Sequence, residues 1–499
     1  MKPLCLAALA ISAVFASSPE ASTRGKCKAA CSSVAKLYPE QLISPSSSAY
    51  AKAQESYWSE QQRSRDPACF FQPTSAEQVQ AAIVHVKRAG CLFSIKGGGH
   101  SYNSRGSSID GGFQFDLVNL NQINIHEDRQ SLTVGPGVRW GPLFKLLEGQ
   151  GLIAVGGRDV GVGVPGFTFG GGLSNLASVR GWAADNLESF DIVLASGELV
   201  TANAKSNPDL FRAVRGGGGH NFGIVVNLTI KLYDYNGMWG GLRIHSQDTF
   251  DDLWDAYDTY IRRLPADGKA HLYVDFARQN GSVVGVTFMA YPEPVQDPPV
   301  FDSFRSIPSV VDTLRLANYS DLSDEQAKAI DSRGRRNSGW TQAVEFDIEL
   351  IKSVVDFWIK TTEDISKRVD AGLDFNIITP GMRNWAARNG TTNAMGLEGP
   401  DEPLINIMLA MAWDDESLDR EVLNTNRRLD EGIRKLATDR YHRFKYMNYA
   451  HLEQDVIASY GEKNKRFLKQ VAAKFDPDSI FQKLQPGGFK LDGPRRQNY

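Results

Sequence analysis

Glycine is the residue type with the clearest chemical meaning in this sequence. The chain contains 46 glycines, and many gather between Gly97 and Gly223, in runs such as 97–99, 170–172 and 216–219. Because glycine has no side chain and adopts positive φ freely, such runs let backbone N–H groups approach a phosphate closely. Several loops of this kind predict a site for a large phosphorylated cofactor.

The spacing of these glycines argues against two common phosphate-binding motifs and a zinc site. Gly161–Gly166 matches GxGxxG formally, but Pro165 lies inside it and Gly170–Gly172 follow, so we do not expect the helix that a Rossmann fingerprint must open. No glycine run leads into Lys-Ser or Lys-Thr, as a Walker A loop requires. No metal site is expected, because HExxH is absent and the eight histidines are scattered.

The elements that must position these loops mix helix and strand. Ser75 and Gln78 form a predicted capping box, and apolar residues at helical spacing continue to Gly90, which predicts a helix. The first half of the chain is therefore expected to form an α+β unit. Its other expected elements are strands over 91–96, 113–118, 123–126 and 131–134 and a helix from about residue 142.

The sequence changes character near residue 236, where the glycine runs end. Apolar residues alternate with Tyr273 and Asp275 in 272–276 and with acidic residues in 344–350, which predicts strands with one solvated or functional face. We expect an antiparallel sheet backed by helices. The other expected elements are strands over 373–378 and 405–413, helices over 251–263 and 352–368, and a last helix that ends at Asp476-Pro477.

The first residues resemble a targeting signal. Lys2 precedes a short apolar run and then small residues, so residues 1–20 are predicted to be a signal peptide; a buried N-terminal helix is the alternative. We therefore expect a secreted protein. In a secreted protein we expect two disulfides, whose pairing the spacing does not determine, and glycans on four sequons. The residues concerned are Cys27, Cys31, Cys69 and Cys91, and Asn227, Asn280, Asn318 and Asn389.

Composition limits the partners. The 499 residues carry 55 basic and 58 acidic side chains, a net charge of −3, which gives no reason to expect nucleic acid. Beyond the leader there is no apolar run long enough to span a membrane. With 42% hydrophobic residues the chain is typical of a folded soluble protein, and we expect a monomer.

The motifs in their order resemble one flavoprotein family. Ile95–Tyr102, Gly156–Arg158, Val162–Gly166, Gly170–Gly172 and Asp185-Asn186 are similar to segments of the berberine bridge enzyme-like FAD-linked oxidases, in the vanillyl-alcohol oxidase and p-cresol methylhydroxylase superfamily. The run 209–224, the motif Tyr446-Met-Asn448-Tyr449 and residues 458–481 also resemble that family.

The resemblance implies a bilobal α+β protein with FAD as cofactor. An FAD-binding lobe of the p-cresol methylhydroxylase type would be built from both chain ends, and a substrate lobe would place an antiparallel sheet over the flavin. The implied boundaries are 21–236 for the FAD-binding domain, 237–435 for the substrate-binding domain and 436–499 for the segment that returns to the FAD lobe.

The resemblance also implies roles for single residues. His100 stands where the family has the histidine bonded to a methyl group of the flavin's benzenoid ring; a phosphate-contacting or capping histidine is the alternative. Doubly linked members carry a cysteine where this chain has Asp159, so a second link is not expected. The other residues implied to bind FAD are Lys96, Gly97, Gly98, Gly99, Ser101, Gly157, Val162, Gly163, Gly166, Gly171, Ile224 and Asn448.

The implied reaction is the oxidation of a CH–OH or activated C–H group of a small metabolite. Tyr446 is the predicted base, with an orienting hydrogen-bond donor as its alternative role. Val162 stands where the family controls oxygen access, which favours an oxidase that reduces O₂ to H₂O₂. A dehydrogenase with another acceptor and a low-turnover flavin- or sugar-binding protein remain alternatives, and the substrate is either a secondary metabolite or a carbohydrate.

Overall fold

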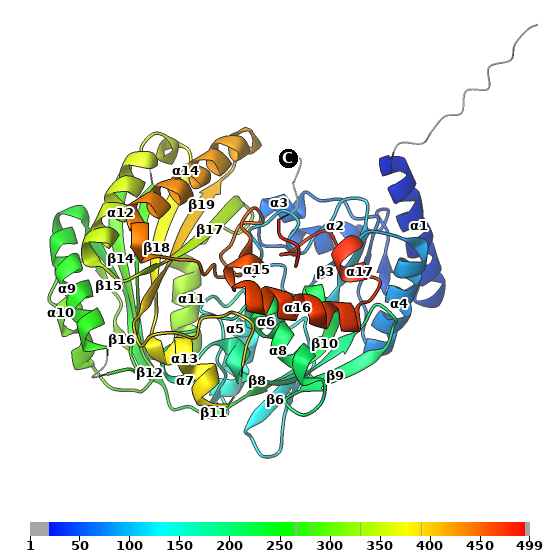
Figure 1. The fold of residues 1–499 in the computed structure, drawn as a ribbon, viewed down its shortest axis with the longest axis horizontal. Helices are drawn as coiled ribbons and strands as arrows, with labels where there is room; N and C mark the ends of the chain where they lie inside the picture. Colours follow the sequence, from blue (N-terminus) through cyan, green and yellow to red (C-terminus); the bar gives the residue numbers. More distant parts are fainter. Residues whose placement is uncertain (1–18, 265–266, 280, 330, 391, 495–499) are drawn as a thin grey trace, which may run out of the picture.

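The chain folds into two lobes that lie side by side (Figure 1). The computed structural model describes residues 19–494, except 265–266, 280, 330 and 391. Most of the predicted signal peptide, residues 1–18, and the sequon residue Asn280 lie outside the described residues. We call the lobe that holds the glycine runs the glycine-rich lobe and the other the sheet lobe.

The glycine-rich lobe contains two sheets. The first has the strand order β1-β2-β4-β3, and its β2, β4 and β3 run parallel. The second is antiparallel, in the order β5-β6-β10-β8-β9. The bounds are β1 Leu42–Ile43, β2 Cys69–Phe71, β3 Phe93–Lys96, β4 Phe113–Asp116, β5 Ile123–Ile125, β6 Ser131–Val134, β8 Leu187–Val193, β9 Leu199–Asn203 and β10 Ile224–Lys231.

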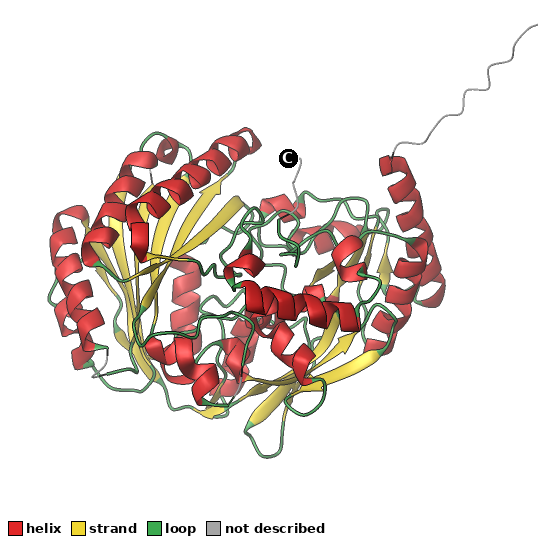
Figure 2. Cartoon of the chain, viewed as in Figure 1, coloured by secondary structure: helices red, strands yellow, loops and turns green. Residues whose placement is uncertain are grey.

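The sheet lobe is built on one large antiparallel sheet with the order β15-β12-β14-β13-β18-β19-β17-β20, and β16 pairs with β12. Helices α9, α12 and α14 cover its outer face over a large apolar core (Figure 2). The bounds are β12 Met238–Ser246, α9 Phe250–Arg263, β13 His271–Gln279, β14 Ser282–Tyr291, β15 Val311–Asp312, β16 Arg315–Ala317, β17 Arg336–Glu345, α12 Ile348–Thr361, β18 Asp370–Ile378, β19 Leu404–Trp413, α14 Asp419–Ala437 and β20 Tyr441–His442.

The inner face of this sheet meets the glycine-rich lobe. A Cβ atom on Gly339 of β17 would lie 2.9 Å from the ring of Tyr102, which follows the first glycine run. The guanidinium of Arg158 lies 4.3 Å from the centre of the Tyr273 ring of β13. Side chains of both lobes therefore share one interface.

The C-terminal segment returns to the glycine-rich lobe, as expected. Phe444, Tyr460 and Leu468 lie in that lobe's main core, and α16 packs on α8. Phe481 of α17 joins the core of the first sheet. Both chain ends thus build this lobe, which confirms the bilobal α+β fold. The bounds are α8 Pro208–Gly217, α16 Glu462–Phe475 and α17 Ile480–Lys483.

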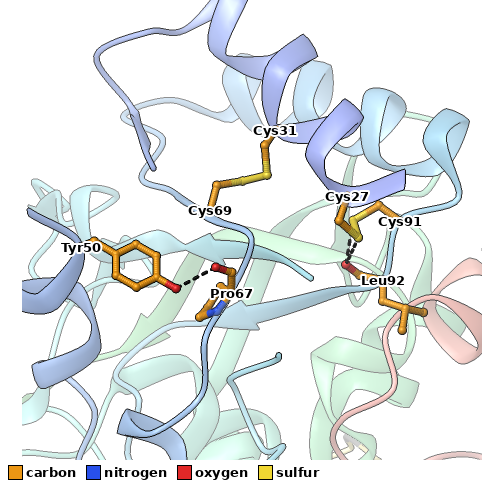
Figure 3. Close-up of a disulfide and its surroundings, with 7 residues drawn as sticks. All are labelled: Cys27, Cys31, Tyr50, Pro67, Cys69, Cys91 and Leu92. Carbon is orange, nitrogen blue, oxygen red and sulfur yellow. Dashed lines mark hydrogen bonds between the residues drawn. A yellow bond between two sulfur atoms is a disulfide. The ribbon is translucent and has the colours of Figure 1, made fainter. Parts of the chain in front are cut away.

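Two disulfides tie helix α1 (Pro19–Leu37) to the first sheet (Figure 3). Cys27 pairs with Cys91 just before β3, and Cys31 pairs with Cys69 in β2. Each bridge closes a long loop, an effect worth about 2–4 kcal/mol. The structure thus supplies the pairing that the spacing left open.

Two local expectations are wrong. No strand continues to Leu350: β17 ends at Glu345, and Asp347 caps α12 by accepting the Leu350 N–H at 3.0 Å. Gln78 caps the backbone N–H of Thr74 instead of forming a box with Ser75. The glycine run does break the helix after Val162–Gly166, as expected: α6 begins at Val164, tolerates Pro165 in its first turn, where backbone N–H groups have no partner within the helix, and ends before Gly170.

Helices connect these sheets, and none among the described residues is long and apolar enough to cross a membrane. Among the sequons, Asn318 and Asn389 are exposed, whereas Asn227 is half-buried. The remaining bounds are α2 Ser48–Glu55, α3 Glu60–Arg63, α4 Ala76–Ala89, α5 Trp140–Glu148, β7 Leu152–Ile153, α6 Val164–Phe169, α7 Ala177–Arg180, β11 Tyr233–Asp234, α10 Asp302–Arg305, α11 Tyr319–Ala329, α13 Pro380–Arg388 and α15 Val456–Ser459.

Candidate active site

Two glycine loops cross in direct contact at the centre of the glycine-rich lobe. A Cβ atom on Gly98 would lie 2.5 Å from Gly163 Cα, and one on Gly163 would lie 2.6 Å from Gly98 N. No side chain fits at either position. The loop after β3 and the loop before α6 can therefore meet only as bare backbone.

Unpaired polar atoms beside these loops indicate a polar ligand. The indole nitrogens of Trp140 and Trp182 and the hydroxyl of Thr168 are buried and have no hydrogen-bond partner among the described residues. Burying such groups without partners is costly. Around Gly166, by contrast, a Cβ atom would meet nothing within 4 Å. Narrow glycine loops, open space and unpaired donors together fit a large polar cofactor such as FAD.

His100 is held in one orientation. Its ring stacks on Trp58, with centroids 4.6 Å apart, and its Nε2 lies 3.5 Å from Asp159 Oδ2. Only 13% of the His100 side chain is exposed. Burial alone would raise the pKa of Asp159, but contacts with His100, the Gly161 N–H and Arg333 bring it below its ordinary value. An anionic carboxylate therefore faces the imidazole.

The other predicted cofactor residues fall into three groups. Gly97, Gly98, Gly99, Val162, Gly163 and Gly166 belong to the crossing loops and the helix start that follows. Three side chains are engaged elsewhere: buried Lys96 forms an ion pair with Asp116 at 3.1 Å, Ile224 lies in the apolar core, and Ser101 accepts the Asn103 N–H at 3.1 Å. Gly157 lies against Trp140, and Gly171 against Tyr446 and Trp182. Their contacts with FAD remain predictions.

Tyr446, the predicted base, is fixed inside the glycine-rich lobe. Its hydroxyl oxygen accepts the Leu173 N–H at 2.8 Å and an amide N–H of Asn448 at 3.0 Å. Asn448 also donates to the Phe167 carbonyl at 3.0 Å. The Tyr446 side chain is fully buried, and burial raises the pKa of its hydroxyl. These contacts fit an orienting role as well as a catalytic one.

Tyr449 lies three residues further on and reaches the sheet lobe. Its hydroxyl accepts a hydrogen bond from Arg158 Nη2, and the same guanidinium covers the Tyr273 ring. Burial raises the pKa of Tyr449, whereas the charge of Arg158 lowers it. Sequence reasoning did not select Tyr449 or Arg158, although both stand inside the quoted motifs.

Two carboxyl groups face each other on the inner side of the sheet. Asp275 of β13 and Asp374 of β18 are direct cross-strand partners. Burial and the neighbouring Asp374 raise the pKa of Asp275 well above its ordinary value. Burial raises the pKa of Asp374 to about 6, although the Asp275 hydrogen bond and Arg158 oppose this rise. Like charges directly opposite repel, so the pair holds one proton near neutral pH.

Comparison with known proteins identifies the family. Residues 67–203 match the model of an FAD binding domain. The chain is 34% identical to the FAD-dependent monooxygenase tpcD of Cochliobolus heterostrophus over 455 residues, and this matched region covers 87% of each chain. This chain belongs to the berberine bridge enzyme-like FAD-linked oxidoreductases. The resemblance carried by the glycine motifs is confirmed, and the protein is an FAD-dependent enzyme.

Solved structures share the fold of this berberine bridge enzyme-like chain. 6-Hydroxy-D-nicotine oxidase of Arthrobacter nicotinovorans matches with a TM-score of 0.77 at 20% identity, over 90% of this chain and 97% of that one. Physcomitrella patens BBE-like 1 and the xylooligosaccharide oxidase of Myceliophthora thermophila C1 each match with a TM-score of 0.74 at 19% identity, over 94% of this chain and 100% of theirs. At these identities the likeness establishes the fold alone.

The sheet face of the berberine bridge enzyme-like chain carries more unpaired polar atoms. Those on the strands are in register, since Tyr273 pairs with Asn376 and Asn376 with Asn406. Arg158 reaches the same face from the glycine-rich lobe, over the Tyr273 ring. Buried polar atoms are usually paired with protein groups or water, so a set without partners on one face fits a bound polar molecule. Those without a partner among the described residues are Arg158 Nη1, His271 Nε2, Asp275 Oδ1, both amide atoms of Asn376, and Asn406 Oδ1. We call this set the polar sheet face.

The Asp275→Asn variant is expected to be more stable than the wild type at about pH 8 but not at about pH 4. An aspartate titrates near 3.9 in an unfolded chain, whereas the pKa of Asp275 is raised in the folded chain. The folded state therefore binds more protons above about pH 4, and its stability falls as the pH rises towards the folded pKa. The melting temperature difference between variant and wild type should grow with pH; a constant difference contradicts the prediction.

Proposed function

We propose that this enzyme is a secreted, monomeric FAD oxidase that takes hydride from a CH–OH or activated C–H group of a small metabolite. FAD linked through His100 would accept the hydride and pass the electrons to O₂, giving H₂O₂. The observation that carries the proposal is the polar sheet face with Tyr449, which lies opposite the glycine loops that fit FAD. The two disulfides support secretion, because such bonds persist in oxidising compartments.

The substrate class favoured is a secondary metabolite with an aromatic ring and several oxygen atoms. Beside the polar sheet face lies an apolar cluster, in which Tyr273 and Phe288 stack with centroids 4.5 Å apart. Leu242 completes its buried part, and Ile244 and Val286 pack against it. An aromatic ring can pack on this cluster while its oxygens meet the unpaired amide, imidazole and guanidinium groups. A carbohydrate remains the second candidate, since one structural neighbour is a xylooligosaccharide oxidase.

The residues of the site suit a proton relay. Bound FAD supplies the hydride acceptor. Tyr449 takes the proton of the substrate hydroxyl, and Arg158 stabilises negative charge on its oxygen. A buried tyrosine is a weak base unless its own proton moves on. Asp374 is the acceptor for that proton, because its pKa of about 6 leaves it ionised near neutral pH.

Val162→Leu is expected to slow reoxidation of the reduced flavin by O₂ at least about tenfold, without changing the rate of flavin reduction. Val162 is half-buried against the main core of the glycine-rich lobe, in the loop that crosses Gly98. A longer side chain would fill the small apolar space that oxygen needs. Mixing reduced enzyme with aerated buffer in a stopped-flow instrument measures this, and Val162→Ala is the control that keeps the space open.

The experiment that tests the function is a substrate screen with product analysis. Aromatic alcohols and phenolic metabolites should cause O₂ uptake with one H₂O₂ for each substrate oxidised, and cello- or xylo-oligosaccharides should not. Slow O₂ uptake with fast reduction of a quinone dye would identify a dehydrogenase. Incorporation of labelled oxygen into the product would identify a monooxygenase, the activity by which the fungal relative is named. If no compound of either substrate class is turned over, the protein is a flavin-binding protein with little or no catalytic activity.

A further inference from the structure

The imidazole of His100 is held on its Nε2 side by a carboxylate that is itself fixed. Asp159 Oδ2 lies 3.5 Å from His100 Nε2, and Asp159 Oδ1 accepts the Gly161 N–H at 2.6 Å. Trp58 stacks on the ring and limits its rotation. Among the described residues, none forms a hydrogen bond with His100 Nδ1. The ring therefore presents Nδ1 as its free nitrogen.

We propose that Asp159 is a positioning residue for the covalent attachment of FAD to His100. The inference rests on the His100 linkage of the proposed function. A carboxylate at Nε2 keeps the proton on that nitrogen, so the lone pair stays on Nδ1, the nitrogen that must attack. The same carboxylate stabilises the positive charge that the ring acquires once both nitrogens are substituted.

The attachment step balances with dioxygen as the oxidant. His100 Nδ1 forms a bond to the methyl carbon of the flavin's benzenoid ring, and one C–H bond of that methyl group breaks. The electron pair of the broken bond passes to O₂, which takes the released proton and one proton from solvent to give H₂O₂. The product is an imidazolium that still carries its Nε2 proton opposite Asp159, so the charge that appears has a counter-ion in place.

The surrounding charges keep Asp159 ionised for this role. Arg333 lies close by, since a Cβ atom on Gly161 would be 3.4 Å from both Arg333 Nη2 and His100 Nε2. Arg139 donates to the Gly161 carbonyl at 2.6 Å and holds the same turn. Although burial alone would raise it, His100, the Gly161 N–H and the charge of Arg333 keep the pKa of Asp159 below its ordinary value.

Asp159 could instead serve only to shape the turn at Gly161, and substitutions separate the two roles. Asp159→Asn keeps an oxygen that accepts the Gly161 N–H but removes the negative charge. Asp159→Glu keeps the charge on a longer side chain. If Asp159 only shapes the turn, Asp159→Asn should attach FAD at the wild-type rate. If Asp159 positions His100, the rate of attachment should depend on the negative charge at residue 159.

The test follows flavin attachment in the full-length chain. Wild type, Asp159→Asn, Asp159→Glu and His100→Ala are produced under flavin limitation and supplied with FAD in aerated buffer. Samples are then acid-precipitated at intervals, and the flavin retained in the pellet is measured. We expect Asp159→Asn to attach FAD at least about tenfold more slowly than wild type while binding the same total FAD, and Asp159→Glu to keep faster attachment than Asp159→Asn.

The outcomes are distinguishable. Equal attachment rates for wild type and Asp159→Asn overturn the role of Asp159. Equal slowing in Asp159→Asn and Asp159→Glu overturns it too, because charge would then be irrelevant. Two results would contradict the His100 linkage of the proposed function itself. One is a wild-type protein that retains no flavin after acid precipitation, and the other is a His100→Ala variant that does retain it.

Discussion

Replacing Tyr449 with phenylalanine is expected to slow anaerobic flavin reduction by about 10²- to 10⁴-fold, the usual contribution of a general base and equal to roughly 3–5 kcal/mol of barrier. The hydroxyl of Tyr449 is the group that Arg158 holds at the interface with the sheet lobe. The aromatic ring and its packing remain in the variant, so substrate binding should change little. Stopped-flow absorbance at saturating substrate measures the rate.

Tyr446→Phe is the matched control for this prediction. Its hydroxyl is engaged by the Leu173 N–H and Asn448 inside the glycine-rich lobe, so we expect a loss of less than about tenfold. A large loss in Tyr446→Phe with a small one in Tyr449→Phe would return the catalytic role to Tyr446, as the sequence motif predicts. Small losses in both would remove tyrosine from the proton transfer.

Asp374→Asn is expected to lower flavin reduction by about 10- to 100-fold at neutral pH and to abolish its dependence on pH. In the wild type, Asp374 must be ionised to accept a proton, and its pKa is raised to about 6. The wild-type rate should therefore rise as the pH increases through about 6. An asparagine cannot accept the proton at any pH, so the variant should be slow throughout.

The control for the pH profile is Asp275→Asn. An asparagine at this position resembles the protonated Asp275, which hydrogen-bonds to Asp374. The midpoint of the pH profile should therefore stay near 6 in this variant. A midpoint that persists in Asp374→Asn would assign the titration to another group, of which Tyr449 and the charged Arg158 face the pair most directly.

Much of the fold could be predicted from the sequence because its signals are local. Helix α4 and strand β6 follow from apolar spacing and a closing glycine, and the change near residue 236 falls just before β12. Local patterns also misled: the alternation of acidic residues up to Glu349 gave no sign that Asp347 caps a helix. Period-two patterning does not distinguish a strand residue from a cap that follows the strand.

Only part of the candidate site could be predicted from the sequence. His100 and the glycine loops stand in contiguous motifs, so they were found together. Asp275 was singled out on its strand, but its pairing with Asp374 depends on the register of β13 against β18, which are separated by other elements. The contact between Arg158 and Tyr449 joins residues 291 positions apart. Such long-range pairings carry no local signature.

The most direct test of the account is the visible absorbance of the enzyme-bound flavin under anaerobic conditions. Adding an aromatic alcohol or phenolic metabolite that the enzyme turns over should bleach the flavin completely, and admitting air should restore the absorbance within seconds as H₂O₂ appears. Absorbance that stays unchanged with every such compound, while the protein retains its FAD, would contradict the claim that this site oxidises a small metabolite.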